Sequence, residues 1–302
     1  MKRHSSGSEI LLLLASVIWG FAFVAQRVGM EHVGPFIFNA VRFALGAAVL
    51  VPFMISSIKK DRETGGALVY LYGVIAGTIL FLGASLQQIG LISTTAGKAG
   101  FITGLYVVLV PVMGIIVGHR TGKETWAGIV LAAAGLYLLS FRGNFSIDKG
   151  DLLVLAGTFF WAAHVLLIGS VTRRTNSLLL ALIQFLTCSI LSFTAAVLFE
   201  TIEVTGLAKA AIPILYGGFL SVGIAYTLQV IAQKRVPSSH AAIILSLETV
   251  FAAIGGWLVL GETIPFRGLI GCTLMFAGIL VSQAGIGKKP KSRNGRDVIE
   301  SG

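Results

Sequence analysis

Apolar residues run in long stretches along this chain, without regular alternation between apolar and polar positions. A helix needs roughly 20 apolar residues to cross the hydrocarbon core of a bilayer. Because the two-residue period of barrel strands is absent, the pattern excludes an outer-membrane barrel and favours an all-α membrane protein. Ten stretches predict membrane-spanning helices: 10–29, 35–55, 67–88, 96–117, 124–141, 150–170, 178–198, 211–232, 238–260 and 266–286.

The composition excludes several classes of protein. Hydrophobic residues make up 55% of the 302 residues and charged residues 12%, whereas soluble proteins carry about 25% charged residues. So few charges cannot cover a water-exposed surface, which excludes a soluble enzyme, a disordered chain and a nucleic-acid-binding protein. No small-residue cleavage site follows the apolar run that begins at Ile10, so we expect a retained span rather than a removed signal peptide.

The distribution of Lys and Arg predicts the orientation. With the N-terminus in the cytoplasm, sixteen of the 23 Lys and Arg residues lie in cytoplasmic segments and five on the opposite side, while Arg42 and Lys98 lie within spans. Positive residues favour the cytoplasmic side, so the net charge of +10 needs no acidic partner. We predict a multi-pass protein of the cytoplasmic (inner) membrane with both termini in the cytoplasm and a basic tail over 288–302.

The two halves of the chain align with each other. At an offset of 142, three positions correspond: Trp19 with Trp161, Arg42 with Gln184, and Lys98 with His240. At an offset of 143, three glycines correspond: Gly118 with Gly261, Gly128 with Gly271, and Gly135 with Gly278. The alignment predicts two five-helix repeats, over 1–145 and 146–287. Because five is odd, the repeats insert in opposite directions, which is typical of secondary transporters with one central site.

Three motifs identify a resemblance to a known family. They are SVIWGFAFV (16–24), the segment Asn39–Phe43, and Ser246–Ala253 followed by Gly261-Glu262. With the five-plus-five duplication, they make residues 9–286 resemble the drug/metabolite transporter superfamily, EamA type. Two departures are Thr249, where the family often has proline, and Gly118-His119, where it often has glycine-glutamate.

The resemblance implies a carrier of small metabolites, since relatives include aromatic amino-acid exporters. It also implies a central cavity lined mainly by the first, third, fourth, sixth, eighth and ninth helices. In addition, it implies that the fifth and tenth helices are peripheral.

Four ionisable side chains in the predicted spans are candidates for substrate binding or coupling, because such groups are costly in lipid and usually face a cavity or a partner. Glu248 could bind a proton or a substrate amine, or lock its helix to a neighbour. Lys98 could attract an anion or extend to the interface. For Arg42, a clamp on loop carbonyls is favoured over a substrate contact. His240, near the inner interface, could be an ordinary solvated histidine.

Several uncharged side chains complete the candidate site. Trp19 and Trp161 lie at the predicted bilayer centre, where tryptophan is unusual, and could form hydrophobic walls. His164 shares a helix face with Trp161 and could donate a hydrogen bond to the substrate. Three further polar residues could line the pathway or only bond between helices: Gln88, Tyr226 and Gln229.

These observations predict a secondary active or facilitative transporter, exporting small metabolites such as amino acids by alternating access. A gated channel is the alternative, and an intramembrane enzyme is less favoured because no cluster of carboxylates or histidines is visible. No Walker A or HExxH pattern occurs, and Cys and His lack metal-ligand spacing, so we expect no enzyme activity and no cofactor. The expected partners are a small-molecule substrate and membrane lipid; proton coupling and a homodimer are left open by the sequence.

Overall fold

The computed structural model describes residues 5–58, 67–119, 121–140, 148–261, 263 and 266–284, and within these ranges it contains helices and no strand. The expected basic tail and the predicted boundary between the repeats lie outside the described residues. The helices are α1 (Ser5–Gly29), α2 (Pro35–Ile58), α3 (Ala67–Gly90), α4 (Ala96–Gly104), α5 (Tyr106–Ile116), α6 (Lys123–Ser140), α7 (Lys149–Val171), α8 (Ser177–Phe199), α9 (Val204–Lys209), α10 (Ala211–Leu215), η1 (Tyr216–Tyr226), α11 (Thr227–Ala232), α12 (Ser238–Leu245), α13 (Glu248–Leu260) and α14 (Phe266–Ala284).

Eight helical segments of the described chain are long and apolar enough to cross a membrane. They correspond to the predicted spans other than 124–141 and 266–286. In place of these two, the structure has α6 and α14, of which α14 holds the shorter apolar stretch Phe266–Ser282. The all-α prediction is therefore confirmed, and the count of ten spans stays a prediction for α6 and α14.

Two of the predicted spans are interrupted near their middle. The span 96–117 consists of α4 and α5, and the span 238–260 consists of α12 and α13. The breaks are tight turns rather than unwound segments, because Leu105 and Leu247 keep right-handed backbone angles (φ −61°, ψ −14° and φ −60°, ψ −15°). The two leucines correspond at the repeat offset of 142, so the breaks occupy equivalent positions in the two halves. Pro111, where the sequence suggests a kink, lies inside α5.

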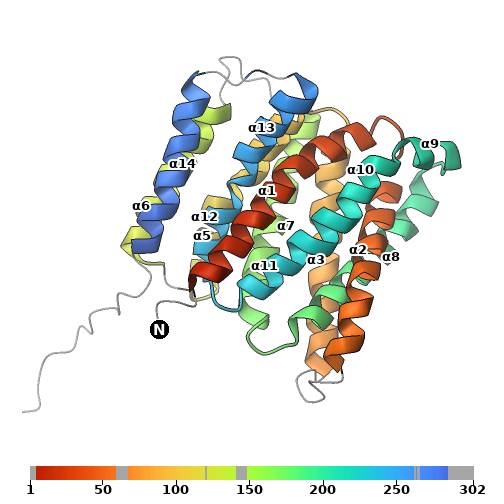
Figure 1. The fold of residues 1–302 in the computed structure, drawn as a ribbon, viewed down its shortest axis with the longest axis horizontal. Helices are drawn as coiled ribbons and strands as arrows, with labels where there is room; N and C mark the ends of the chain where they lie inside the picture. The colour runs from red at the N-terminus through yellow and green to blue at the C-terminus, as the bar shows by residue number, and fades with distance from the viewer. Residues whose placement is uncertain are drawn as a thin grey trace, which may run out of the picture.

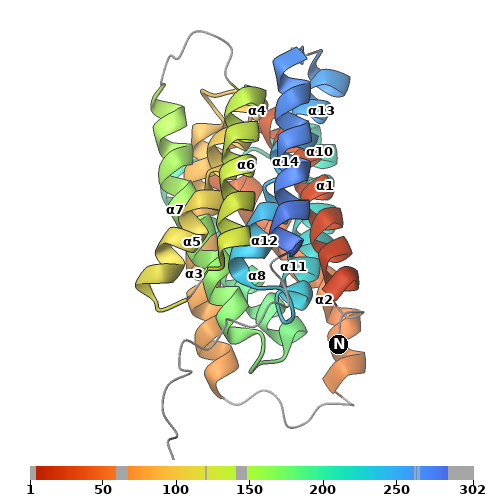
Figure 2. The same cartoon turned by 90° about the vertical axis from the view of Figure 1, so that its left-hand side faces the viewer.

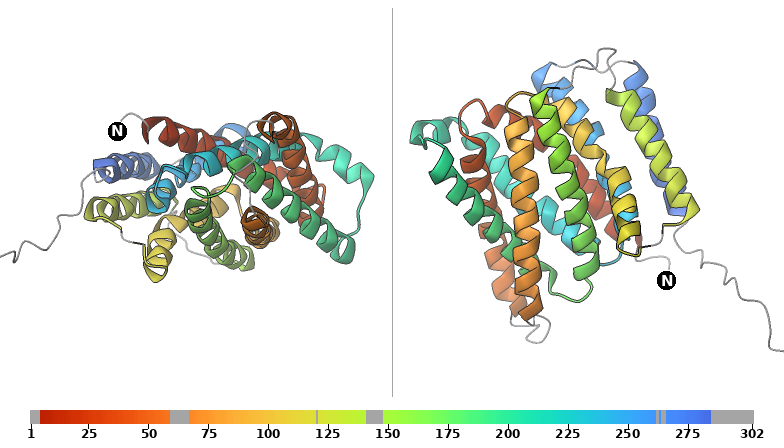
Figure 3. Two further views of the ribbon diagram at one scale, coloured as in Figure 1. Left: turned by 90° about the horizontal axis from the view of Figure 1, so that it is seen from below. Right: turned by 180° about the vertical axis from the view of Figure 1, so that it is seen from behind.

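The two halves run in opposite directions. In Figure 1, α1 rises from the end of the bundle near the N-terminus. Figure 3 (right) shows α7 beginning at the other end and descending beside α3. The opposed directions match the five-helix period of the predicted inverted repeat.

Helices α6 and α14 lie side by side at one edge of the bundle (Figures 1 and 2). Their glycines allow backbone contact. A Cβ atom on Gly135 would meet the carbonyl oxygen of Gly271, and one on Gly278 would meet that of Gly128. Small residues permit such close approach between helices in lipid, so the last helices of the two halves are joined through glycine.

A carboxylate caps the start of α2. Glu200, which follows α8, accepts hydrogen bonds from the backbone N–H groups of Phe36 (2.7 Å) and Ile37 (2.9 Å). The first N–H groups of a helix lack internal partners, and the helix dipole favours a negative charge there. Glu200 therefore fixes the start of α2 to the end of α8.

Candidate functional site

A cavity lies in the centre of the bundle, at the level of the breaks after α4 and α12. Its volume is about 40 Å³, enough for a few water molecules. The lining residues are Trp19, Phe23, Gln26, Arg42, Gln87, Thr103, Tyr106, Trp161, His164, Val165, Ser221, Tyr226, Gln229, Leu245 and Glu248.

Ten of these fifteen residues form five pairs that correspond at the repeat offset of 142. The pairs are Trp19 with Trp161, Phe23 with Val165, Gln87 with Gln229, Thr103 with Leu245, and Tyr106 with Glu248. Each half of the chain therefore contributes equivalent positions to one cavity. The charges, in contrast, are not duplicated, because the counterparts of Arg42 and Glu248 are Gln184 and Tyr106.

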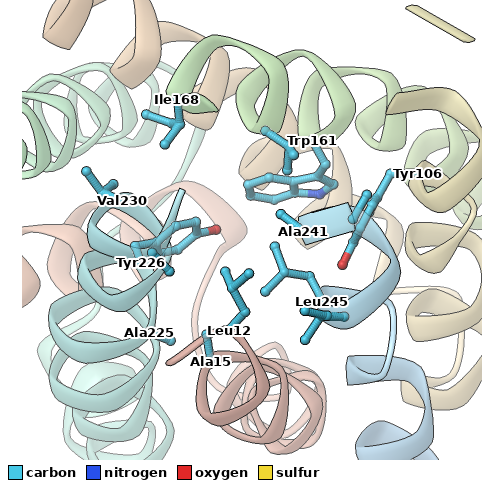
Figure 4. Close-up of a cluster of buried hydrophobic side chains, with 14 of the residues drawn as sticks. Leu12, Ala15, Tyr106, Trp161, Ile168, Ala225, Tyr226, Val230, Ala241 and Leu245 are labelled. Atoms are coloured by element: carbon cyan, nitrogen blue, oxygen red, sulfur yellow. The ribbon is translucent and has the colours of Figure 1, made fainter. Parts of the chain in front are cut away.

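Tyr226 is at the centre of an aromatic cluster beside the cavity. The centroid of its ring lies 4.6 Å from that of Trp19, 6.3 Å from that of Trp161 and 6.0 Å from that of His164. Figure 4 shows Trp161 on α7 lying between Tyr226 of η1 and Tyr106 of α5. The η1 segment is a π-helix, a form that is often found at functional sites. Within it, the carbonyl oxygen of Ser221 accepts a hydrogen bond from Trp19 Nε1 (3.2 Å).

Gln87 of α3 connects its helix to three others through its amide group. Its Oε1 accepts hydrogen bonds from Trp161 Nε1 (2.9 Å) and Thr103 Oγ1 (3.3 Å), and its Nε2 donates to Gln26 Oε1 (3.2 Å). The bonds hold α1, α3, α4 and α7 together at the cavity. Because buried hydrogen-bond partners restrict rotamers, the indole of Trp161 is fixed in place.

His164 and Arg42 are both almost fully buried. His164 Nε2 lies 2.9 Å from Gln184 Oε1. The guanidinium of Arg42 lies over the rings of Phe38 and Phe43, 5.5 and 5.1 Å from their centroids. Among the described residues, no carboxylate forms an ion pair with Arg42, so its charge faces the cavity and aromatic rings.

Glu248 is the first residue of α13, and Tyr106 is the first residue of α5. The Tyr106 hydroxyl lies near the Glu248 carboxyl. Neither Tyr106 Oη nor Glu248 Oε1 completes a hydrogen bond in the described structure. A buried carboxyl oxygen without a partner is costly, so this position is suited to a ligand, a proton or water.

Three of the expected site residues lie away from the cavity. Lys98 Nζ pairs with Asp151 (2.9 Å) and Asp148 (3.4 Å) at the start of α7. His240 Nδ1 bonds to Ser282 Oγ (2.8 Å). Gln88 is buried and donates to the carbonyl oxygen of Gln26 (3.3 Å).

The seven other expected residues line the cavity: Glu248, Trp19, Trp161, His164, Arg42, Tyr226 and Gln229. Eight further lining residues were not among the residues expected from the sequence, and they include Gln26, Gln87 and Tyr106. The repeat offset is the signal that finds two of them, since it leads from Gln229 to Gln87 and from Glu248 to Tyr106.

The part of the chain that the structure describes holds no group of three or more His, Cys, Asp or Glu side chains that could bind a metal ion.

Comparisons with known proteins identify the family. The model of the EamA-like transporter family matches the chain twice, over residues 7–141 and 148–283. An "Uncharacterized transporter" of Archaeoglobus fulgidus is 33% identical over 275 residues, which cover 91% of this chain and 85% of the relative. A "Probable amino-acid metabolite efflux pump" of Salmonella typhimurium is 25% identical over 293 residues, which cover 91% of this chain and 94% of the relative.

A solved structure supports the same fold. A protein crystal structure superposes with a TM-score of 0.75 at 20% sequence identity, covering 92% of this chain and 97% of that chain. The two family matches span most of the chain. They confirm the resemblance that the sequence motifs predicted. This multi-pass membrane protein belongs to the EamA-like transporter family of the drug/metabolite transporter superfamily.

Proposed function

We propose that this protein carries small zwitterionic metabolites, such as amino acids, out of the cell by exposing its central cavity alternately to the two sides of the membrane. The observation that carries the proposal is the presence of two oppositely charged residue types in this cavity. One buried cation, Arg42, and one buried acid, Glu248, line the same space. An α-amino acid brings one carboxylate and one ammonium group, which these two residues complement.

The hydrogen-bonding capacity of the cavity supports this substrate class. Arg42 Nε is a buried donor without a partner in the described structure, and Gln229 Oε1 and Glu248 Oε1 are buried acceptors without one. Most buried polar atoms in folded proteins are paired, so unpaired ones at a cavity indicate places for ligand atoms. The guanidinium of Arg42 would bind the substrate carboxylate, and Gln229 with Glu248 would bind its ammonium group.

The walls favour an apolar or aromatic side chain on the substrate. Trp19, Trp161 and Tyr226 present their rings to the cavity. A cation near such rings gains a further attraction. The cavity is small in this conformation, so substrate would enter only when one end of the bundle opens.

Similarity to a named relative agrees with the proposal. The Salmonella typhimurium relative is named as an amino-acid metabolite efflux pump. From it we take the substrate class and the outward direction for this chain, with both termini in the cytoplasm and the cytoplasmic membrane as its location. Protons are the proposed coupling ion, because Glu248 could bind a proton when substrate leaves.

Counterflow in proteoliposomes tests the proposal. Vesicles loaded with unlabelled amino acids receive a trace of the same labelled compound outside. We expect saturable counterflow for a subset of amino acids, and its loss when the carboxylate is amidated or the amine acetylated. Flux that rises in proportion to concentration, without counterflow, would identify a channel. Equal transport of the blocked and unblocked compounds would overturn the zwitterion assignment.

A further inference from the structure

Two contacts between a basic and an acidic side chain join the halves of the protein, one at each end of the cavity. At one end, Lys98 Nζ of α4 lies 2.9 Å from Asp151 Oδ2 of α7. At the other end, His240 Nε2 of α12 lies 3.4 Å from Glu9 Oε1 of α1. In both contacts one residue comes from the first half of the chain and the other from the second half.

The two contacts are copies of each other in the internal repeat. Lys98 corresponds to His240 at the repeat offset of 142, and Glu9 corresponds to Asp151 at the same offset. The basic member lies in the first part of a broken helix, near the start of α4 or α12. The acidic member lies near the start of α1 or α7. Inversion of the halves places the two copies at opposite ends.

Both contacts lie at the same depth relative to the cavity. Trp19 follows Glu9 by ten residues on α1, and Trp161 follows Asp151 by ten residues on α7. Ten residues of helix span about 15 Å. Each acidic residue therefore lies about three turns along its helix from a tryptophan that lines the cavity, and the two contacts lie on opposite sides of it.

The surroundings of each contact hold it in place. Asp151 also accepts hydrogen bonds from Thr94 Oγ1 (2.5 Å) and from the backbone N–H of Asp148 (3.0 Å). His240 is bonded through Nδ1 to Ser282 of α14. The Lys98 contact has hydrogen-bond geometry, whereas His240 Nε2 completes no hydrogen bond. The second contact is thus the looser one.

We infer that Lys98–Asp151 and His240–Glu9 are the two barriers of the transport pathway, each joining the halves at one end and opening while the other stays closed. The inference rests on the proposed transport function and assigns Lys98 and His240 a positioning role at the pathway ends. Both contacts are present in this structure, in which the central cavity is small.

Side-specific labelling of a cysteine in the cavity tests the barriers. The cysteine replaces Ser221, in a background where Cys188 and Cys272 are changed to alanine. A small, charged, membrane-impermeant thiosulfonate reagent is added to one side of sealed vesicles of known orientation. We expect Lys98→Gln to raise the labelling rate roughly two- to five-fold from the end that carries residue 98, the range available from a partly exposed ion pair. Glu9→Gln should raise it from the opposite end.

Matched controls separate the barriers from general loosening. Lys98→Arg keeps the charge and should label like the parent protein. Arg27→Gln removes a cation at the same end as Lys98, but Arg27 pairs with Glu31 of the same half (3.9 Å), so its labelling should not change. Unchanged labelling in Lys98→Gln and Glu9→Gln, or equal increases from both sides, would overturn the inference.

The labelling readout is independent of transport. Side-specific changes in a protein that carries no amino acid would support the barriers and count against the proposed substrate class. Normal counterflow with unchanged labelling would overturn the barriers and leave the proposed function standing.

Discussion

Tyr106 and Glu248 lie beside each other at the central cavity, although they come from opposite halves of the chain. Each is the first residue of the second part of a broken helix. The first half of the protein thus places a phenol where the second half places a carboxyl. The cavity therefore has a carboxyl group at this position from the second half alone.

Glu248→Gln should abolish accumulation driven by a pH gradient, while counterflow continues with a higher KM because the substrate ammonium group loses its carboxylate partner. The amide has the shape of the carboxyl but cannot exchange a proton. With one proton coupled to one substrate, a pH difference of one unit supports an accumulation ratio of about tenfold, which should fall to one in the variant. Labelled substrate in proteoliposomes measures the ratio. Glu31→Gln, at an exposed site outside the cavity, is the control. Full accumulation by Glu248→Gln would contradict proton coupling at this residue.

Arg42→Gln should weaken binding of substrates that carry a carboxylate. Glutamine is already tolerated at the equivalent position of the other half, Gln184. Loss of a charge-assisted hydrogen bond of about 1.5–3 kcal/mol should raise KM roughly ten- to hundredfold. Concentration-dependent counterflow measures KM, and Arg27→Gln is the matched control. If KM stays at the parent value, Arg42 has a packing role on Phe38 and Phe43.

Glu200→Ala should destabilise the fold without changing KM. The substitution removes both hydrogen bonds to the start of α2, which should cost about 1–2 kcal/mol. Thermal unfolding in detergent should show a lower midpoint. Glu203→Ala is the control, because Glu203 is exposed and makes no side-chain cap bond. Equal midpoints for the two variants would show that the cap contributes nothing measurable.

Gly135→Leu should separate α6 from α14. The added side chain meets the Gly271 backbone and Met275, and overpacking of this kind typically costs about 1–3 kcal/mol. A lower unfolding midpoint or faster proteolysis of the final helix is expected. Gly7→Leu is the control, since a Cβ atom there meets nothing within 4 Å. A parent-like midpoint for Gly135→Leu would show that the helices can move apart freely.

The helical architecture could be predicted because lipid imposes long apolar segments, and the repeat could be predicted from aligned residues such as Trp19 and Trp161. The direction in which side chains point was harder to predict. The sequence favours Gln88, but its neighbour Gln87 lines the cavity, because one residue turns a helix by about 100°. A span that is apolar on all sides gives little indication of which face is inside.

The ion pairs could not be predicted from local pattern. Lys98 lies 53 residues from Asp151, its partner on another helix, so the local sequence leaves Lys98 available for a substrate anion. The breaks at Leu105 and Leu247 hold no proline, and a glycine, Gly104, flanks only the first of them. Their positions depend on packing between helices, as does the π-helix around Ser221.

The glycine contacts between α6 and α14 are self-complementary. Gly128 meets Gly278, and the copies of these two residues, Gly271 and Gly135, meet each other in the same way. An interface of this kind is the type that joins identical subunits across a two-fold axis. Two separate five-helix chains, inserted into one bilayer in opposite orientations, would find the same partners. Linking them into a single polypeptide therefore needs a connecting loop, but no new contact surface between the two halves.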